Sequence, residues 1–334
     1  MKAVIFNGSG TPLRVAEFQK PRPQKDQVQI QIKAAALNHR DLWIMEEQSA
    51  GSRPEGTILG SDGVGTITDV GEDADPLLVG AEVIINPSLE WGLNPVVQGD
   101  AFKILGFPDN GTFAEFICIS RKYVFEVPEA FSPEECSAIP LSGLTAYRAL
   151  FSKARLRSKE KVLIAGIGGG VALWALTFAA SYGARVFVTS GSTEKIQRAV
   201  ALGAEGGFNY KDPNWAAEAS RVAGGGFDII LDSAGGDQFS KFIEMALPGG
   251  RIVNFGRTAG NITNISTRLL YSKQLSIFGS TMGTRDEFLS MLDFVESRKL
   301  RPVIDSIYPI DEVMLAIERM KSGQQFGKIV IRIK

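Results

Sequence analysis

The sequence predicts an α/β protein of two domains, one rich in β-strands and one built on a doubly wound parallel sheet. The chain has 334 residues, which is more than one hydrophobic core usually supports. Apolar and polar residues alternate through its first third, as in strands buried on one face. From about residue 126, wholly apolar strands alternate with helical segments, which is typical of a parallel sheet covered on both faces.

The first domain is predicted from three alternating segments, residues 28–33, 64–70 and 113–119. Side chains of a strand point to opposite faces in turn, so this period of two indicates one buried face in each segment. Glycines and prolines interrupt the chain around these segments, at Pro21, Pro23, Gly60, Gly63, Gly71 and Gly80. A compact barrel with long connections fits this pattern best.

The second domain is predicted from apolar strands and the helices that follow them. Two helical segments, residues 171–182 and 193–202, each end at a glycine. The strands that alternate with such helices are residues 162–164, 185–189, 228–231 and 251–255. This alternation predicts βαβ units and a parallel sheet.

The end of the chain is expected to return to the first domain. A further amphipathic helix spans residues 285–298, and the last strand is predicted at 328–332. We therefore expect residues 1–125 and 286–334 in the β-rich domain and residues 126–285 in the parallel-sheet domain.

Composition excludes several classes of function. The net charge is −1, so we expect no surface for nucleic acid or anionic lipid. Two cysteines, Cys118 and Cys136, favour buried reduced thiols over a disulfide framework. Residues 162–184 are uncharged over the length of a membrane span, but their glycines favour a strand that turns into a helix. The first residues form too short an apolar run for a signal peptide, and we expect a cytoplasmic protein.

A cluster of glycines follows the strand at 162–164 and opens the next helix. Gly166, Gly168, Gly169 and Gly170 precede Val171. Glycines allow a tight turn and a close approach of the backbone to a pyrophosphate, whose charge then lies on free N–H groups at the helix N-terminus. Because the cluster lies between a strand and a helix of a βαβ unit, it predicts a dinucleotide site.

The end of the second strand indicates which dinucleotide binds. An NAD site usually has Asp or Glu there to bind the ribose 2′-hydroxyl. Here the strand ends in small hydroxyl residues that include Ser190, and Lys195 follows on the helix. Ser190 and Lys195 can bind a 2′-phosphate, and Tyr210 after the next short strand can add a third contact. We therefore expect NADP(H) as the cofactor.

With these residues in view, the chain resembles the medium-chain dehydrogenase/reductase superfamily along nearly its full length. It is most similar to the zinc-independent quinone oxidoreductase group. The motifs that carry the resemblance are GSDGVG at 60–65, GTFAE at 111–115, GLTAY at 143–147, the glycine turn and LPGGR at 247–251. The resemblance implies a GroES-like β-barrel catalytic domain formed by both termini, with a Rossmann domain between them. It also implies that Phe255, Gly256, Gly279, Ser280 and Thr281 lie beside the nicotinamide.

The resemblance also shows which metal ligands are absent. Zinc-dependent members hold the catalytic metal with a cysteine, a histidine and a third cysteine or acidic residue. The matching positions here are Asn38, Ser61 and Leu141, an amide, a hydroxyl and an aliphatic side chain, which do not suit zinc. The segment 86–110 lacks the four cysteines of a structural zinc lobe, and the single histidine is His39. We expect no metal.

These residues indicate hydride transfer without a Lewis acid. We expect NADPH-dependent reduction of quinones or α,β-unsaturated carbonyls, because their transition states spread charge over a conjugated system. Candidate catalytic residues are Asn38 and Thr145 as hydrogen-bond donors, with Ser61 assisting. The proton donor stays open among His39, Tyr147 and water. Candidate aromatic walls of the pocket are Trp43 and Trp91.

Two other functions remain open at this point. One is a zinc-free alcohol or aldehyde dehydrogenase, and the other is a non-catalytic, crystallin-like protein that binds NADP(H). In every case the partner is a small molecule rather than a nucleic acid or a membrane. By analogy with relatives that pair an edge strand across a dimer axis, we expect a homodimer formed through residues 275–278.

Overall fold

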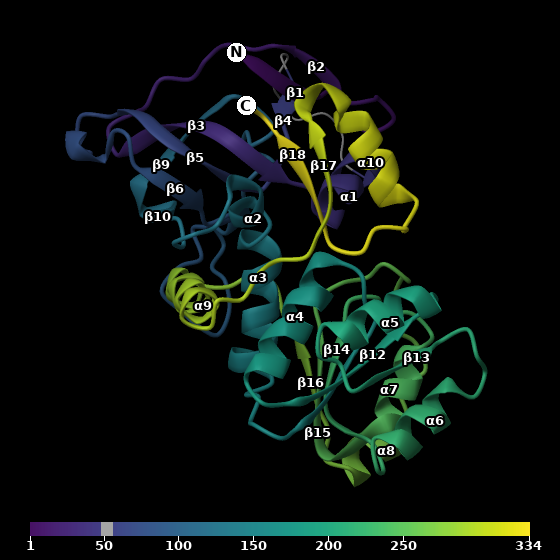
Figure 1. The fold of residues 1–334 in the computed structure, drawn as a ribbon. Coiled ribbons are helices and arrows are strands. Elements are labelled where there is room, and N and C mark those ends of the chain that lie inside the picture. Colours follow the sequence, from purple (N-terminus) through teal and green to yellow (C-terminus); the bar gives the residue numbers. More distant parts are fainter. Residues whose placement is uncertain (48–55) are drawn as a thin grey trace. The chain divides into compact units, whose positions relative to one another are not determined.

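The computed structural model describes residues 1–47 and 56–334. They form two compact units, one of Met1–Leu144 with Gly283–Lys334 and one of Thr145–Met282. Figure 1 shows that the first unit is mostly strand and the second alternates strands and helices. An α/β fold with a β-rich and a parallel-sheet part is therefore confirmed.

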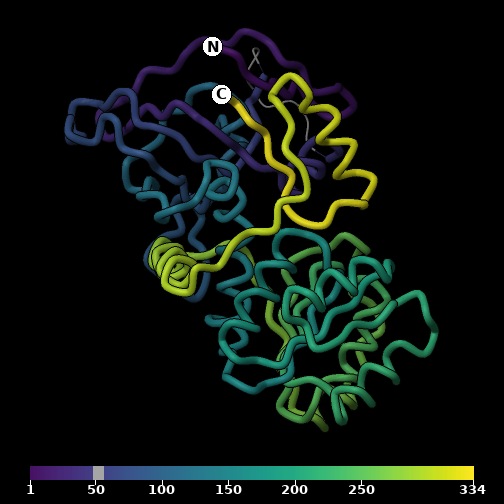
Figure 2. The backbone as a smooth tube through the Cα atoms, viewed as in Figure 1, coloured from purple at the N-terminus to yellow at the C-terminus, as the bar shows by residue number. Residues whose placement is uncertain are grey.

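The first unit is organised around the long strand β3 (Gln27–Ala36). β3 pairs antiparallel with β5 (Asp62–Val70), β9 (Phe116–Ser120) and β18 (Lys328–Arg332). The last strand of the chain thus lies in the N-terminal sheet, as the backbone in Figure 2 also shows. The alternation that predicted β3 is its burial pattern, with Val28, Ile30 and Ile32 in the core.

The remaining elements of the first unit complete the larger sheet, a three-stranded sheet, a two-stranded sheet of β7 and β8, and the helices beside them. A seven-stranded sheet has the order β10-β6-β5-β3-β18-β17, with β9 also on β3, and a smaller sheet has the order β2-β1-β4. The strands are β1 (Lys2–Phe6), β2 (Arg14–Glu17), β4 (Thr57–Ile58), β6 (Glu82–Ile85), β7 (Ser88–Leu89), β8 (Lys103–Ile104), β10 (Val124–Glu126) and β17 (Ile304–Pro309). The helices are α1 (His39–Glu47), α2 (Pro133–Ser137), α9 (Arg285–Ser297) and α10 (Val313–Lys321).

The second unit is a single six-stranded parallel sheet in the order β13-β12-β11-β14-β15-β16. This order is that of a doubly wound dinucleotide-binding sheet. Its strands are β11 (Lys161–Ile164), β12 (Arg185–Ser190), β13 (Gly206–Asn209), β14 (Phe227–Asp232), β15 (Ala246–Asn254) and β16 (Ser276–Gly279). The helices are α4 (Gly170–Ser181), α5 (Thr193–Ala201), α6 (Trp215–Val222), α7 (Phe239–Met245) and α8 (Thr267–Ser272).

Several element boundaries differ from the sequence-based expectation. The strand expected at 113–119 begins only at Phe116, because the preceding residues pair with β1: Val4 N–H donates to Phe113 O and Glu115 N–H donates to Lys2 O. Helix α4 begins at Gly170, one residue earlier than expected. None of the helices in the described part of the chain is long and apolar enough to cross a membrane.

The boundary between the units also lies later than residue 125. Residues 126–144 belong with the first unit because they are tied to it by specific contacts. The backbone N–H of Leu141 donates to Asp62 Oδ1 at 2.8 Å. A methyl group on Gly143 would lie 3.0 Å from Met291 Sδ of α9. Helix α3 (Pro140–Tyr147) therefore begins in the first unit and ends in the second.

Candidate functional site

The glycine turn of the second unit joins β11 to α4. Gly166 has φ +71° and Gly168 has φ +133°, conformations that residues with a side chain rarely adopt. The turn is fastened to β12, because Gly166 N–H donates to Thr189 Oγ1 at 3.1 Å and Ile167 N–H donates to Thr189 O at 2.8 Å. Gly169 caps α4, and a methyl group there would meet no atom within 4 Å. The space before the helix is therefore open.

The first turn of α4 can hold an anion. Gly170 and Val171 begin the helix, and the cap residue makes no side-chain hydrogen bond to it. The N–H groups of a first helical turn have no partner within their own helix, and the helix dipole favours negative charge beside them. A helix that begins without a side-chain cap, directly after an open glycine turn, fits the pyrophosphate of a dinucleotide.

Ser190 at the end of β12 and Tyr210 directly after β13 were expected to bind the 2′-phosphate of the ribose. Ser190 is buried, and its Oγ accepts from Ser192 N–H at 3.2 Å. Tyr210 N–H donates to Ser190 O at 3.2 Å, and a methyl group on Gly191 would lie 2.8 Å from Tyr210 Oη. Tyr210 therefore folds over the tip of β12. Lys195 lies in the first turn of α5, half-buried.

Lys211 is a residue of this region that the sequence analysis missed. A methyl group on Gly191 would lie 2.9 Å from Lys211 Cε, so the lysine chain reaches the same tip as Tyr210. Its side chain is exposed. The sequence signal that could have identified Lys211 as a phosphate-binding candidate was its position directly after Tyr210. Lys195 and Lys211 could thus flank a phosphate at the end of β12.

The far end of the same sheet edge carries the residues expected at the nicotinamide. Phe255 and Gly256 follow β15, and a methyl group on Gly256 would lie 2.3 Å from Ser233 O, so only glycine fits. Gly279 ends β16, and Ser280 N–H donates to Asn254 O at 2.9 Å. Ser280 Oγ is buried with no hydrogen-bond partner in the described part of the chain. An orphaned hydroxyl here fits a cofactor amide that would complete its hydrogen bonding.

Thr281 follows Ser280 and is half-buried. The expected cofactor residues therefore come from the ends of β12 and β16, from the segments that follow β11, β13, β15 and β16, and from the first turns of α4 and α5. Parallel strands end at one edge of the sheet, which is where open α/β sheets bind their ligands. The residues present fit a nicotinamide dinucleotide.

The first unit contains a buried polar cluster around Asn38. Lys328 Nζ lies 2.8 Å from Asp62 Oδ2, 2.7 Å from Asn38 Oδ1 and 2.8 Å from Leu37 O. Lys328 enters from the last strand of the chain, Asp62 opens β5, and Asn38 precedes α1. The three donor positions of the ammonium group are therefore satisfied by three acceptors.

The Asn38 amide is held in one orientation by this cluster. Its oxygen accepts from Lys328, and its Nδ2 donates to Asp62 Oδ2 at 2.9 Å. The second Nδ2–H has only a long contact of 3.4 Å to Ala36 O. Asn38 is 7% exposed, so this weakly used N–H is the one it could offer to a substrate.

Ser61 supports Arg40 in this structure. Its hydroxyl is fully buried, accepts from Arg40 Nη1 at 2.7 Å and donates to Leu105 O at 2.7 Å. The assisting role at the substrate that we expected for Ser61 therefore gives way to a supporting role one residue removed. The sequence missed Arg40, Asp62 and Lys328; the one available signal was a lysine opening the apolar strand β18.

Burial shifts the titration of two groups in this cluster. It raises the pKa of Asp41 to about 6, although Arg40 and the bond from Asn38 N–H oppose the shift. The Asn38 N–H donates to Asp41 Oδ2 at 2.8 Å, and Asp41 Oδ1 has no hydrogen-bond partner in the described chain. Burial lowers the pKa of Arg40, against the attraction of Asp41 and Asp62.

The residues at the metal-ligand positions do not fit zinc. Ser61 is committed to Arg40 and Leu105, and Leu141 offers this cluster only its backbone N–H. The Lys328 ammonium already neutralises Asp62, so a metal cation there would meet a fixed like charge. Across residues 1–47 and 56–334, no three His, Cys, Asp or Glu side chains cluster as a metal site. Cys118 and Cys136 are free, as expected, and burial raises their pKa to about 11 and about 12.

The other candidate residues have more varied surroundings. Thr145 belongs to the second unit and is buried, with Oγ1 4.0 Å from Met282 Sδ. His39 begins α1 and is exposed, and Trp43 on the same helix is half-buried. Trp91 packs edge-on against Phe102, with ring centroids 5.3 Å apart, and donates Nε1–H to Asn94 O. Trp91 is thus a structural residue of its own loop.

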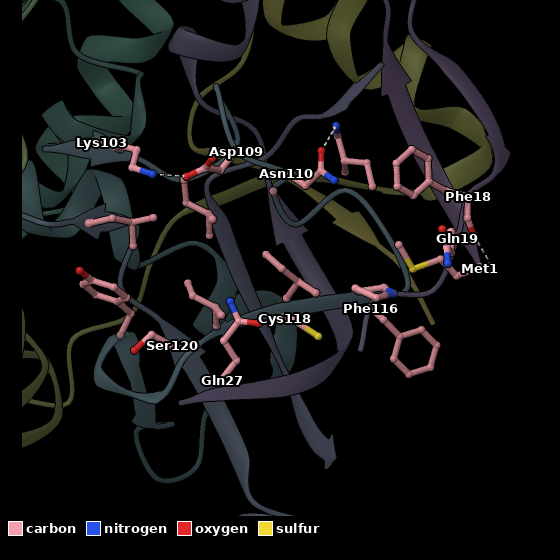
Figure 3. Close-up of a pocket in the computed structure, with 18 of the residues that line it drawn as sticks. Met1, Phe18, Gln19, Gln27, Lys103, Asp109, Asn110, Phe116, Cys118 and Ser120 are labelled. Atoms are coloured by element: carbon pink, nitrogen blue, oxygen red, sulfur yellow. Dashed lines mark hydrogen bonds and ion pairs between the residues drawn. The ribbon is translucent and has the colours of Figure 1, made fainter. Parts of the chain in front are cut away.

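A separate cavity of about 420 Å³ lies beside β9 in the first unit (Figure 3). Three of its polar side chains are already paired, since Lys103 pairs with Asp109 at 2.7 Å and Asn110 Oδ1 accepts from Ile58 N–H at 3.0 Å. None of the predicted site residues lines it. The candidate residues therefore form two separate groups, one at the sheet edge of the second unit and one in the Asn38 cluster of the first.

Comparison with known proteins agrees with both halves of this description. Residues 24–129 match the alcohol dehydrogenase GroES-like domain, and residues 170–297 match the zinc-binding dehydrogenase domain. The zinc-type alcohol dehydrogenase-like protein YogA of Leptosphaeria maculans is 33% identical over 96% of this chain and 95% of its own. Human quinone oxidoreductase is 28% identical over 95% and 92% of the two chains.

A crystal structure of an NAD-dependent alcohol dehydrogenase matches with a TM-score of 0.94 and 34% identity, covering 100% of both chains. The family resemblance and the two-part fold are therefore confirmed. The chain belongs to the medium-chain dehydrogenase/reductase superfamily of oxidoreductases, with a GroES-like domain and a Rossmann-type parallel sheet.

Proposed function

We propose that this protein uses NADPH to reduce quinones or α,β-unsaturated carbonyls by hydride transfer without zinc. The observation that carries the proposal is the Lys328–Asp62–Asn38 cluster, in which the Asn38 amide stands at one ligand position of the zinc-dependent members and is bonded to the Lys328 ammonium and the Asp62 carboxylate. A substrate polarised only by hydrogen bonds and fixed charges reacts best when its transition state delocalises charge.

Three groups of residues at the strand ends would each bind a different part of the cofactor. Gly166, Gly168, Gly169, Gly170 and Val171 would hold the pyrophosphate. The 2′-phosphate would lie among Ser190, Lys195, Tyr210 and Lys211. The nicotinamide, which supplies the hydride when bound, would meet Phe255, Gly256, Gly279, Ser280 and Thr281. A phosphate flanked by two lysines would favour NADPH over NADH.

At the reacting end, Asn38 and Thr145 would fix the substrate carbonyl and the cofactor amide by hydrogen bonds. Lys328 holds the oxygen of the Asn38 amide, so its nitrogen is the end left to donate. Ser61 keeps Arg40 in place rather than touching substrate. Proton delivery would come from water, from the exposed His39 or from Tyr147.

The relatives support an oxidoreductase but carry different substrate names. Human quinone oxidoreductase favours the proposed reaction, whereas the YogA-like relative and the matched crystal structure are named as alcohol dehydrogenases. The ligand positions favour the first group because they lack zinc donors. A zinc-free alcohol dehydrogenase is the second candidate.

The test is a turnover screen over quinones, enones, aldehydes and alcohols with NADPH, NADH and their oxidised forms. We expect the highest kcat/KM for NADPH with a quinone or an enone. Asn38→Ala should lower that value by about one to two orders of magnitude, with NADPH affinity nearly unchanged. Fast oxidation of simple primary alcohols without turnover of quinones or enones would favour the alcohol dehydrogenase instead. Binding of NADPH without turnover of any substrate would favour a non-catalytic protein.

A further inference from the structure

Arg40 is a half-buried arginine whose guanidinium is held by hydrogen bonds from one nitrogen, Nη1. It lies in the first turn of α1, and its Nη1 donates to Ser61 Oγ at 2.7 Å and to Leu105 O at 2.9 Å. Both acceptors are buried, and Leu105 also accepts from Ser61. Two bonds to one nitrogen hold the planar group in place before any ligand arrives.

Within residues 1–47 and 56–334, the rest of the guanidinium has no hydrogen-bond partner. No residue in the described ranges accepts a hydrogen bond from Arg40 Nε or Nη2, and no carboxylate there forms an ion pair with Arg40. Half-buried arginines normally have a paired charge, because desolvating an unpaired guanidinium is costly. The cost is visible in the pKa of Arg40, which burial lowers.

The neighbouring carboxylates attract Arg40 but are bonded to other groups. Asp62 already pairs with Lys328 at 2.8 Å. Asp41 directs Oδ2 to the Asn38 N–H at 2.8 Å. Neither carboxylate therefore occupies the Nε and Nη2 edge of the Arg40 guanidinium.

We propose that the unpaired edge of the Arg40 guanidinium is a binding subsite for a negatively charged substrate oxygen. The position supports this assignment, because Arg40 is bonded to Ser61 and lies two residues from Asn38, which are the positions matching metal ligands in zinc-dependent members. A guanidinium offers a planar pair of N–H donors that suits an oxygen on a trigonal carbon. The subsite rests on the proposed function for its place in a reaction.

The charged oxygen has two possible sources with the same chemistry. In enone reduction, the hydride pair forms the new C–H bond at the β-carbon, and the C=C pair shifts so that the carbonyl pair moves onto oxygen as an enolate. A proton from water then completes the saturated ketone, while NADPH becomes NADP⁺. The other source is a carboxylate that the substrate carries throughout. Arg40 would stabilise the first mainly in the transition state and the second already in the bound substrate.

A binding experiment tests the subsite without turnover. Crotonate and its neutral counterpart crotonamide are titrated into the full-length protein saturated with NADP⁺, and affinity is measured by calorimetry. We expect Arg40→Gln to weaken crotonate by about tenfold or more while crotonamide changes by less than about twofold. Arg40→Lys, which keeps the charge, should retain more crotonate affinity than Arg40→Gln. Arg22→Gln, which removes an exposed arginine, is the matched control and should change neither ligand.

A kinetic experiment separates the two sources. If the enolate is bound, Arg40→Gln should lower kcat for a neutral enone by about tenfold or more with little change in KM. If a substrate carboxylate is bound, the same change should raise KM for an enoate and spare the neutral enone. Thermal unfolding of each variant identifies any that fail to fold. If Arg40→Gln fails to fold, the kinetics of Arg40→Lys are compared with those of the parent protein to separate the two sources.

The outcomes for the subsite and for the proposed reaction are distinguishable. Arg40-dependent binding of crotonate by a protein that turns over no quinone or enone would retain the subsite and reject the reaction. Normal enone kinetics together with unchanged crotonate binding in a folded Arg40→Gln variant would retain the reaction and overturn the subsite.

Discussion

Lys328 Nζ lies 2.8 Å from Asp62 Oδ2 inside the first unit, where the two side chains are 4% and 0% exposed. The lysine comes from the last strand of the chain and the carboxylate from β5, and the two residues are 266 positions apart in the sequence. This pair connects the C-terminal strand to the segment that carries Asn38. The charge balance around Asn38 also depends on this pair, because each of the two side chains neutralises the other.

Removing either partner of this pair should be strongly destabilising. Lys328→Met or Asp62→Leu alone leaves one buried charge unpaired, which we expect to cost about 3–5 kcal/mol. The double variant replaces both charges and should cost clearly less than the sum of the two single changes. Urea unfolding of the three variants measures this coupling. Additive losses would show that the two charges do not stabilise one another.

The purified protein should carry no stoichiometric zinc, and chelators should leave its activity intact. The expectation rests on the donors present: an amide bound to Lys328, a hydroxyl bound to Arg40 and Leu105, and the aliphatic Leu141. Elemental analysis before and after dialysis against a chelator makes the measurement. About one tightly bound zinc per chain would contradict the expectation.

Asp41 should make stability depend on pH between about 4 and 6. Its pKa is raised to about 6 in the folded protein, above the value near 3.9 of an unfolded chain. The folded state therefore binds this proton more tightly, and the carboxyl opposes folding increasingly as pH rises through that window. At pH 7 the ionised group should cost about 2 kcal/mol relative to pH 4.

Asp41→Asn tests this dependence because an amide oxygen can still accept from Asn38 N–H but does not ionise. The free energy of unfolding of the variant, minus that of the parent, should rise by about 2 kcal/mol from pH 4 to pH 7. Asp73→Asn, at an exposed carboxylate, is the control and should give a flat difference. A flat difference for Asp41→Asn as well would contradict the raised pKa.

The fold could be predicted from sequence because its signals are local, and the candidate cofactor residues were placed by the same signals. Gly166 and Gly168 adopt the positive φ values for which glycine is needed, and they follow β11, whose apolar run is continuous. Parallel strands necessarily bring their carboxyl ends to one edge. Local patterns therefore fixed the order of these residues along the sheet edge.

The Asn38 cluster could not be predicted in the same way. Lys328 meets Asp62 only because β18 joins the N-terminal sheet, which is a long-range pairing with no local signature. The side-chain orientation of Arg40 could not be predicted from sequence either, because its contact with Ser61 depends on the angle between β3 and α1. The alignment of Ser61 with a metal ligand suggested a residue facing substrate, whereas burial committed its hydroxyl to Arg40.

We propose that the protein forms a homodimer through β16. This strand is at the edge of the six-stranded sheet and is only half-buried, and Tyr271 just before it is 69% exposed. An unprotected edge strand can pair with its copy in a second chain. Light scattering after size exclusion should give twice the chain mass. Ile277→Pro should produce the monomer by disturbing the strand, whereas Leu93→Lys, at an exposed residue of the first unit, should not. A monomer in the parent protein would reject the proposal.

NADPH should bind more tightly than NADH by tenfold or more, as expected for at least one charge-assisted bond to the 2′-phosphate. Ser190, Lys195 and Tyr210 were the residues expected to make such bonds, and Lys211 reaches the same strand tip. Lys195→Ala and Lys211→Ala should each weaken NADPH by about 1.5–3 kcal/mol while leaving NADH nearly unchanged, because only NADPH carries the second phosphate. Fluorescence titration of both cofactors provides the affinities. Lys25→Ala removes an exposed positive charge in the first unit and should alter neither cofactor. Equal losses for NADPH and NADH, or a preference for NADH in the parent protein, would show that the tip of β12 does not bind a phosphate.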